Sequence, residues 1–183
     1  MFISAFDLAT MTGCCAGEMG GKPRCWSWDL HEAGEGRPRR LGLLMRNLRS
    51  FFDATPCDRA VYEAPQTLPV MARLGASDDV IAFLRGSVGV LEATCAERDI
   101  PVEALSVQDA RGAVLGWRTN KGVGKPRAKS RQTKDRVLRE VRLFHKICAE
   151  NDNEADAAVT WLYACSRLNP RLAVSLTPLF RGL

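Results

Sequence analysis

Short apolar runs separated by turn-forming residues dominate the start of the chain. They cover Phe2–Ala9, Gly13–Glu18 and Arg24–Leu30. In the third run Trp26 and Trp28 occupy alternating positions, as the two-residue period of a pleated strand requires. Glycines and a proline between the second and third runs are typical of a turn. The pattern therefore predicts three consecutive strands.

Beyond this region, helical spacing of apolar residues alternates with short apolar runs. The elements expected in chain order are a helix from about Pro38 to Ala54, a strand in 58–65, a helix from Asp78 or Asp79 to Arg98, a strand in 100–107, a short helical piece in 107–117, and helices at about Thr133–Ala149 and Asp152–Leu168. Residues 118–132 are rich in Gly, Lys and Arg and are interpreted as a mobile loop, and the apolar tail 170–183 is expected to dock on the rest. This order predicts an α/β fold in which a five-stranded mixed sheet carries helices on both faces, within a single domain spanning residues 1–183.

Charge is distributed very unevenly along the chain. The net charge is +5, but residues 111–146 hold twelve Lys or Arg and two acids, which leaves the remainder near −5. A local excess of this size is typical of a surface that binds a polyanion. A solvated basic face without a partner is the ordinary alternative.

Composition excludes several other classes of protein. No stretch approaches the roughly 18 to 20 uninterrupted apolar residues of a membrane-spanning helix, and no basic leader precedes the first apolar run, so neither a membrane protein nor a secretion signal is expected. The seven cysteines are an odd number, and Cys14 and Cys15 are adjacent. Both features suit a reduced cytoplasmic protein better than a disulfide framework.

Two acidic side chains stand where predicted strands leave the core, and a third lies on a predicted helix. Asp7 ends the first strand, Glu63 ends the fourth, and Asp156 lies on the last helix. Asp152 and Asn153 precede Asp156 by four and three residues, so either shares a helix face with it. Carboxylates that converge in this way are preferred ligands of Mg²⁺, and two such ions would activate water and stabilise the leaving oxygen in phosphodiester cleavage.

Each of these residues also has an ordinary structural explanation. Asp7 could begin a turn, Glu63 could pair with an arginine, and Asp152 could cap a helix. Asn151 and Glu154 have the spacing of a capping box. Taken together, and beside a strongly basic segment, the acids favour a metal-dependent nuclease.

Three motifs in this order resemble the RuvC Holliday junction resolvases of the ribonuclease H-like superfamily. They are FDLATMTG, AVYEAP and DNEADAA, and the resemblance covers roughly residues 1–168. Because its loops diverge, the chain is most similar to phage-type members of the family. The resemblance implies a ribonuclease H-like fold and magnesium-dependent cleavage of four-way DNA junctions.

Carried over by position, the resemblance implies Asp7 as a ligand shared by two Mg²⁺ ions, Glu63 as a second ligand and Asp156 as the last acid, with Mn²⁺ able to substitute. The family usually has Asp or His three residues before the last acid, where this chain has Asn153. Either Asn153 binds through its carbonyl oxygen or Asp152 replaces it. A carboxylate is the better Mg²⁺ ligand, which favours Asp152.

The resemblance also implies a basic residue near the scissile phosphate, for which Lys134 is the first choice and Arg131 the second. The residues expected to bind DNA are Arg118, Lys121, Lys125, Arg127, Lys129, Arg131 and Lys134. A two-fold homodimer would suit the symmetry of a four-way junction. The expected location is the cytoplasm of a bacterial cell or of a phage-infected host.

Two other interpretations stay open at this point. One keeps the fold and changes the substrate to an RNA–DNA hybrid, a flap or another branch. The other is a DNA-binding module of the same fold that has lost its metals, which Asn153 in place of an acid would favour.

Overall fold

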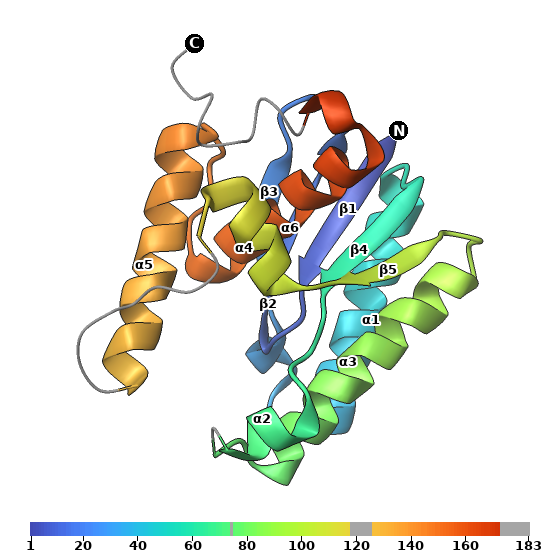
Figure 1. Cartoon of the computed structure of the whole chain (residues 1–183). Coiled ribbons are helices and arrows are strands. Elements are labelled where there is room, and N and C mark those ends of the chain that lie inside the picture. Colours follow the sequence, from blue (N-terminus) through green and yellow to red (C-terminus); the bar gives the residue numbers. More distant parts are fainter. Residues whose placement is uncertain (74, 118–125, 173–183) are drawn as a thin grey trace.

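The computed structural model describes residues 1–73, 75–117 and 126–172, without the side chains of residues 126–130. Within this part of the chain, five strands form one sheet in the order β3-β2-β1-β4-β5 (Figure 1). The strands are β1 (Phe2–Asp7), β2 (Met11–Glu18), β3 (Arg24–Asp29), β4 (Arg59–Glu63) and β5 (Val102–Leu105). The first three form an antiparallel meander, and β4 and β5 run parallel to β1. The predicted mixed sheet is confirmed.

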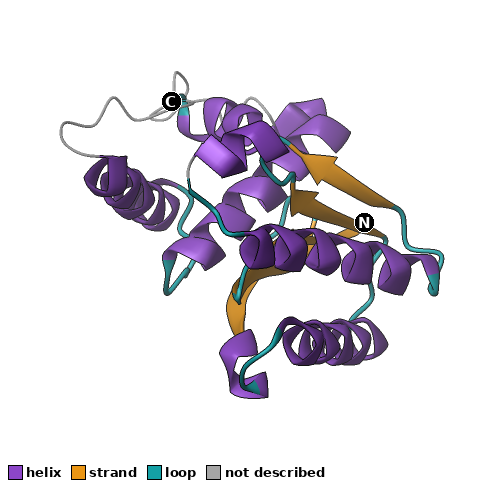
Figure 2. Ribbon diagram, turned by 90° about the horizontal axis from the view of Figure 1, so that it is seen from below, coloured by secondary structure: helices purple, strands orange, loops and turns teal. Residues whose placement is uncertain are grey.

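Helices cover both faces of this sheet, as Figures 1 and 2 show. The helices are α1 (Arg37–Ala54), α2 (Leu68–Arg73), α3 (Asp78–Ala96), α4 (Val107–Leu115), α5 (Pro126–Phe144) and α6 (Asp152–Leu168), with a 3-10 turn η1 at Leu30–Ala33. One core contains Ile3 and Ala5 of β1 together with residues of α4, α5 and α6. The other contains Phe6 of the same strand with residues of α1 and α3. Because successive side chains of β1 point to opposite faces of the sheet, this strand contributes residues to two separate cores.

The prediction was wrong about the helix expected at Thr133–Ala149. That helix is α5, which begins at Pro126, so the loop predicted over 118–132 is helical from residue 126 onward. Proline fits the first turn of a helix, and the Lys, Arg, Gln and Ala that follow are strong helix formers. The helix also ends earlier, at Phe144, because Lys146 has a positive φ of 55°. Residues 118–125 and most of the tail, 173–183, lie outside the described residues.

Smaller differences concern the ends of elements. Strand β1 ends at Asp7 rather than Ala9, and β2 begins at Met11 rather than Gly13. Leu30 begins η1 rather than ending β3, and its side chain is buried. A short helix, α2, follows β4 where no element was expected. Proline at the second position of α2 and the shortness of the helix explain why periodicity did not indicate it.

The last helix, α6, is the element that brings the far end of the chain to the sheet. It packs on β1 and β2, and the indole Nε1 of its buried Trp161 donates to the carbonyl of Ile3 at 3.0 Å. Its bounds are those expected from the sequence. None of the described helices combines the length and apolar character needed to cross a bilayer.

Candidate metal and DNA-cleavage site

Asp7 and Glu63 leave the sheet side by side. They are the last residues of β1 and β4, which are parallel neighbours with Phe6 opposite Tyr62. Parallel strands present their carboxyl ends at the same edge of a sheet, so the two side chains emerge together. The buried, apolar residues that precede each acid hold its backbone rigidly.

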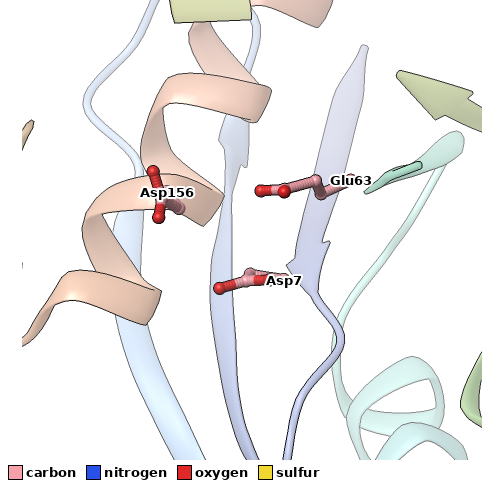
Figure 3. Close-up of side chains that lie close together, drawn as sticks. All are labelled: Asp7, Glu63 and Asp156. Atoms are coloured by element: carbon pink, nitrogen blue, oxygen red, sulfur yellow. The ribbon is translucent and has the colours of Figure 1, made fainter. Parts of the chain in front are cut away.

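Asp156 approaches the same edge from α6. One carboxylate oxygen from each of Asp7, Glu63 and Asp156 lies within 4.8 Å of the others, and Figure 3 shows the three side chains pointing toward a common space. We call these three residues the acidic triad. They come from positions 7, 63 and 156, so only the tertiary structure brings them together.

Burial and mutual repulsion keep the acidic triad from ionising easily. Burial raises the pKa of Asp7 well above its ordinary value, and the charges of Glu63 and Asp156 raise it further. The pKa of Glu63 rises to about 7, mainly because the side chain is buried and also because the charge of Asp156 is near. Like charges held this close favour protonation until a cation neutralises them.

A divalent cation fits the acidic triad on chemical grounds. Its donors are all carboxylate oxygens, which hard ions such as Mg²⁺ and Mn²⁺ prefer over softer metals. Burial is the main cause of the raised pKa of Asp7 and Glu63, and a cation placed among the three acids would remove the repulsion that adds to it. The residues present therefore suit the magnesium expected from the sequence.

Arg111 is a member of this site that sequence reasoning missed. Its Nη2 donates to Asp156 Oδ1 at 2.7 Å, and both side chains are largely buried. Burial raises the pKa of Asp156, while Arg111 opposes that rise. The available signal was the position of Arg111 on α4, between the buried Ala110 and Val114, where an arginine needs an acidic partner.

Gly13 lets α6 come close enough to complete the acidic triad. Gly13 lies opposite Asp7 in the β1–β2 ladder. A Cβ at this position would lie 2.1 Å from the backbone oxygen of Asn153 and 2.9 Å from the backbone nitrogen of Glu154. Only glycine leaves room for the first turn of α6 to rest directly on β2.

This chain resembles known proteins in its fold. No protein-family model and no curated protein matches the sequence. Solved structures do match. Thermus thermophilus RuvC shares 15% identity at a TM-score of 0.63, and the same protein in complex with a Holliday junction substrate shares 14% at 0.67, each match covering 92% of this chain and 96% of the other. The chain has a RuvC-like fold.

A third match supports the same fold from a distant source. The yeast mitochondrial Holliday junction resolvase Ydc2 shares 13% identity at a TM-score of 0.52, over 93% of this chain and 82% of the other. Identities this low show the RuvC-like fold alone.

Within the RuvC-like fold, the two candidates for a fourth ligand have different surroundings. Asp152 lies outside the 4.8 Å cluster and forms an ion pair with Lys134. Its charge still contributes to raising the pKa of Asp7 and Asp156, so it lies near them. Asn153 rests with its backbone on β2. The choice between Asp152 and Asn153 stays a prediction.

Only part of the predicted DNA-binding set can be located in the RuvC-like fold. Arg118, Lys121 and Lys125 lie outside the described residues, and Arg127 and Lys129 lie on α5 without described side chains. Arg131 is exposed, and the side chain of Lys134 is about half exposed. Lys134 also acts on all three members of the acidic triad, since its charge opposes the rise in their pKa.

Other basic residues of the segment 111–146 are engaged inside the protein. Arg136 lies over the ring of Trp117, 4.3 Å from its centroid, and both side chains bond to the buried Glu140. Arg142 donates to the backbone carbonyls of Ala149 and Glu150. The positive charge free to meet a polyanion is thus smaller than the count of twelve suggests.

Proposed function

We propose that this chain is a divalent-metal-dependent endonuclease that cuts branched DNA, with the four-way Holliday junction as its substrate. One observation carries the proposal: the acidic triad converges at the edge of a sheet whose fold is shared with a RuvC structure solved with a Holliday junction. Holding the buried Asp156 beside the half-buried Asp7 and Glu63 is costly, and metal binding offsets that cost.

Each residue of the site has a distinct part in the proposed reaction. Asp7, Glu63 and Asp156 hold the metal, and Arg111 orients the carboxylate of Asp156 through their 2.7 Å hydrogen bond. Two Mg²⁺ ions would supply an activated water and stabilise the oxygen that leaves in phosphodiester cleavage. Lys134, beside the acidic triad, and the exposed Arg131 would hold the phosphate backbone.

Cleavage of defined substrates tests the proposal. A synthetic four-way junction, an RNA–DNA hybrid and a plain duplex are incubated with the protein and Mg²⁺, Mn²⁺ or EDTA. We expect the junction to be cut preferentially, by symmetric nicks, and only with metal. Equal cutting of all three would argue for a nuclease without junction selectivity, and preference for the hybrid for a ribonuclease.

A variant separates catalysis from binding. Asp7→Asn should abolish cleavage and leave junction binding intact or tighter, because it removes a metal ligand and a negative charge that repels DNA. Asp53→Asn makes the same change on an exposed ion pair with Arg98 at the end of α1 and should cut normally. If the unmodified protein with Mg²⁺ binds junctions and cuts nothing, the chain is a binding module instead.

The remaining expectations are part of the same proposal. A two-fold homodimer would present two acidic triads to the two symmetric strands of a junction. The proposed setting is the cytoplasm of a bacterial cell or of a phage-infected host, where seven cysteines would stay reduced.

A further inference from the structure

Glu154 is a buried carboxylate two residues before the last member of the acidic triad. It is 3% exposed. Its Oε1 accepts from Ser27 Oγ at 3.0 Å and from Asn151 Nδ2 at 2.9 Å, and its Oε2 accepts from the backbone nitrogen of Glu150 at 2.7 Å. Asn151 Nδ2 also donates to Ser27 Oγ at 3.1 Å, which closes the network.

Capping of α6 accounts for only part of the bonding of this carboxylate. Asn151 is the N-cap, and its Oδ1 accepts from the backbone nitrogen of Glu154 at 3.0 Å. Besides its bonds to Asn151 and to the backbone of Glu150, the Glu154 side chain accepts from Ser27, a residue of β3. A buried charge is tolerated only when its hydrogen bonds are made, and the positive end of the helix dipole stabilises it further. The network therefore has two roles: it caps the first turn of α6, and it attaches that turn to β3.

The strand register explains why this attachment matters for the acidic triad. Asp7, Gly13 and Ser27 form one row across β1, β2 and β3, because Gly13 lies opposite both of the others. The first turn of α6 lies on this row. Its backbone touches Gly13, and its Glu154 binds Ser27. Two adjacent points of one row thus hold the start of the helix that carries Asp156.

A shift of the helix start would change the distances within the acidic triad. Asp156 follows Glu154 by two residues on the same rigid helix, so any lift or rotation at Glu154 moves the Asp156 carboxylate relative to Asp7. Steric contact at Gly13 limits only how close α6 can come. The hydrogen bond to Ser27 limits how far it can move away.

We propose that Glu154, bound to Ser27, is a positioning residue that sets the separation of Asp156 from Asp7 and thereby the affinity of the site for a divalent metal. The inference rests on the proposed function only in assuming that the acidic triad binds metal. Residues that orient metal ligands typically change metal affinity by 10- to 100-fold when they are replaced.

Direct binding of Mn²⁺, measured by calorimetry without DNA, tests the inference. Glu154→Gln places an amide NH₂ against groups that are themselves donors, so we expect Mn²⁺ to bind about tenfold more weakly. Ser27→Ala removes the link to β3 and keeps the charge, and should weaken binding severalfold. Glu150→Gln is the matched control, since it removes an exposed acid four residues away and should bind Mn²⁺ normally.

Junction cleavage at varied Mg²⁺ separates positioning from a general loss of structure. For Glu154→Gln we expect the half-saturating Mg²⁺ concentration to rise about tenfold, in step with Mn²⁺ affinity. The rate at saturating Mg²⁺ should return to within a few-fold of normal. In a merely destabilised protein the loss of rate at each Mg²⁺ concentration would equal the unfolded fraction at that same concentration, which urea unfolding in the same buffer reports.

Several outcomes would overturn the inference. The inference is wrong if a folded Glu154→Gln protein binds Mn²⁺ with unchanged affinity. If Glu154→Gln does not fold, unchanged Mn²⁺ affinity in Ser27→Ala would overturn the inference in its place. If the unmodified protein binds Mn²⁺ and cuts no DNA, the proposed function fails while the positioning inference is still decided by the Mn²⁺ affinities. If the unmodified protein binds no Mn²⁺, both are wrong.

Discussion

Replacing Gly13 by alanine would test how closely α6 must approach the sheet. The new Cβ would lie 2.1 Å from the carbonyl oxygen of Asn153 and 2.3 Å from its carbonyl carbon, whereas ordinary van der Waals contact begins at 3.4 Å. Both neighbours are backbone atoms, so no side chain can turn away. The start of α6 must therefore move by about 1 Å, since a close-packed interior offers no slack.

The displacement has two consequences of different size. Overpacking of this kind costs about 1–3 kcal/mol of unfolding free energy. The effect on cleavage should be larger, because a misplacement of about 1 Å at a catalytic group can lower the rate about 100-fold. The displaced turn carries Asp152 and Asn153 and leads directly into Asp156, so the acidic triad opens when the turn moves.

Urea unfolding and junction cleavage under saturating Mg²⁺ measure the two consequences separately. Gly89→Ala is the matched control, because nothing lies within 4 Å of a Cβ there and the residue is exposed on α3. It should leave cleavage unchanged and raise stability by about 0.5–1 kcal/mol. Cleavage by Gly13→Ala within about twofold of normal, at unchanged stability, would refute the view that this contact sets the acidic triad.

Three further predictions concern charge in the site. Because burial and Asp156 raise the pKa of Glu63 from 4.5 to about 7, the folded state binds this proton more tightly than the unfolded state. The free energy of unfolding in EDTA should therefore fall by up to about 3 kcal/mol as the pH rises from 4.5 to about 7, and Mg²⁺ should stabilise the protein more at pH 8 than at pH 5. A rise in the unfolding free energy over this pH range, measured by urea unfolding, would contradict the prediction. Arg111→Met leaves the buried Asp156 without its ion-pair partner and should lower the unfolding free energy by about 3 kcal/mol at pH 8 without metal. Mg²⁺ should restore part of this loss. An unchanged urea midpoint would show that the Arg111–Asp156 pair contributes nothing to stability. Asp152→Asn should weaken Mn²⁺ binding about tenfold and Asn153→Ala less than about twofold, because a carboxylate is the stronger ligand; calorimetry giving the reverse order would make Asn153 the fourth ligand.

Much of the fold could be predicted because its signals are local. The buried stripe of α6 and its Asn151 cap define the helix within the printed sequence, and the structure begins and ends it where expected. The apolar runs that end at Asp7 and Glu63 likewise place both acids at strand ends. Periodicity and capping depend on neighbours a few residues apart, so they can be recognised without knowledge of the fold.

The start of α5 was mispredicted for a local reason as well. Proline and a high density of positive charge favoured a loop, yet the helix begins at Pro126. Proline is compatible with both states at a helix start. Burial of Val137 and Val141 in the core beside α6 stabilises the helix that extends back from them.

What the sequence by itself determined was most of the elements, the basic segment, and the acids at the ends of β1 and β4 and at the start of α6. Helix α2 and the first turns of α5 were not among them. The tertiary structure alone decided which groups meet: Arg111 with Asp156 across 45 positions, and Glu154 with Ser27 across 127. Such pairings depend on strand register and on the distance between a helix and a sheet, which no periodic pattern encodes. The acids were visible in the sequence, whereas the contacts that hold them in place were not.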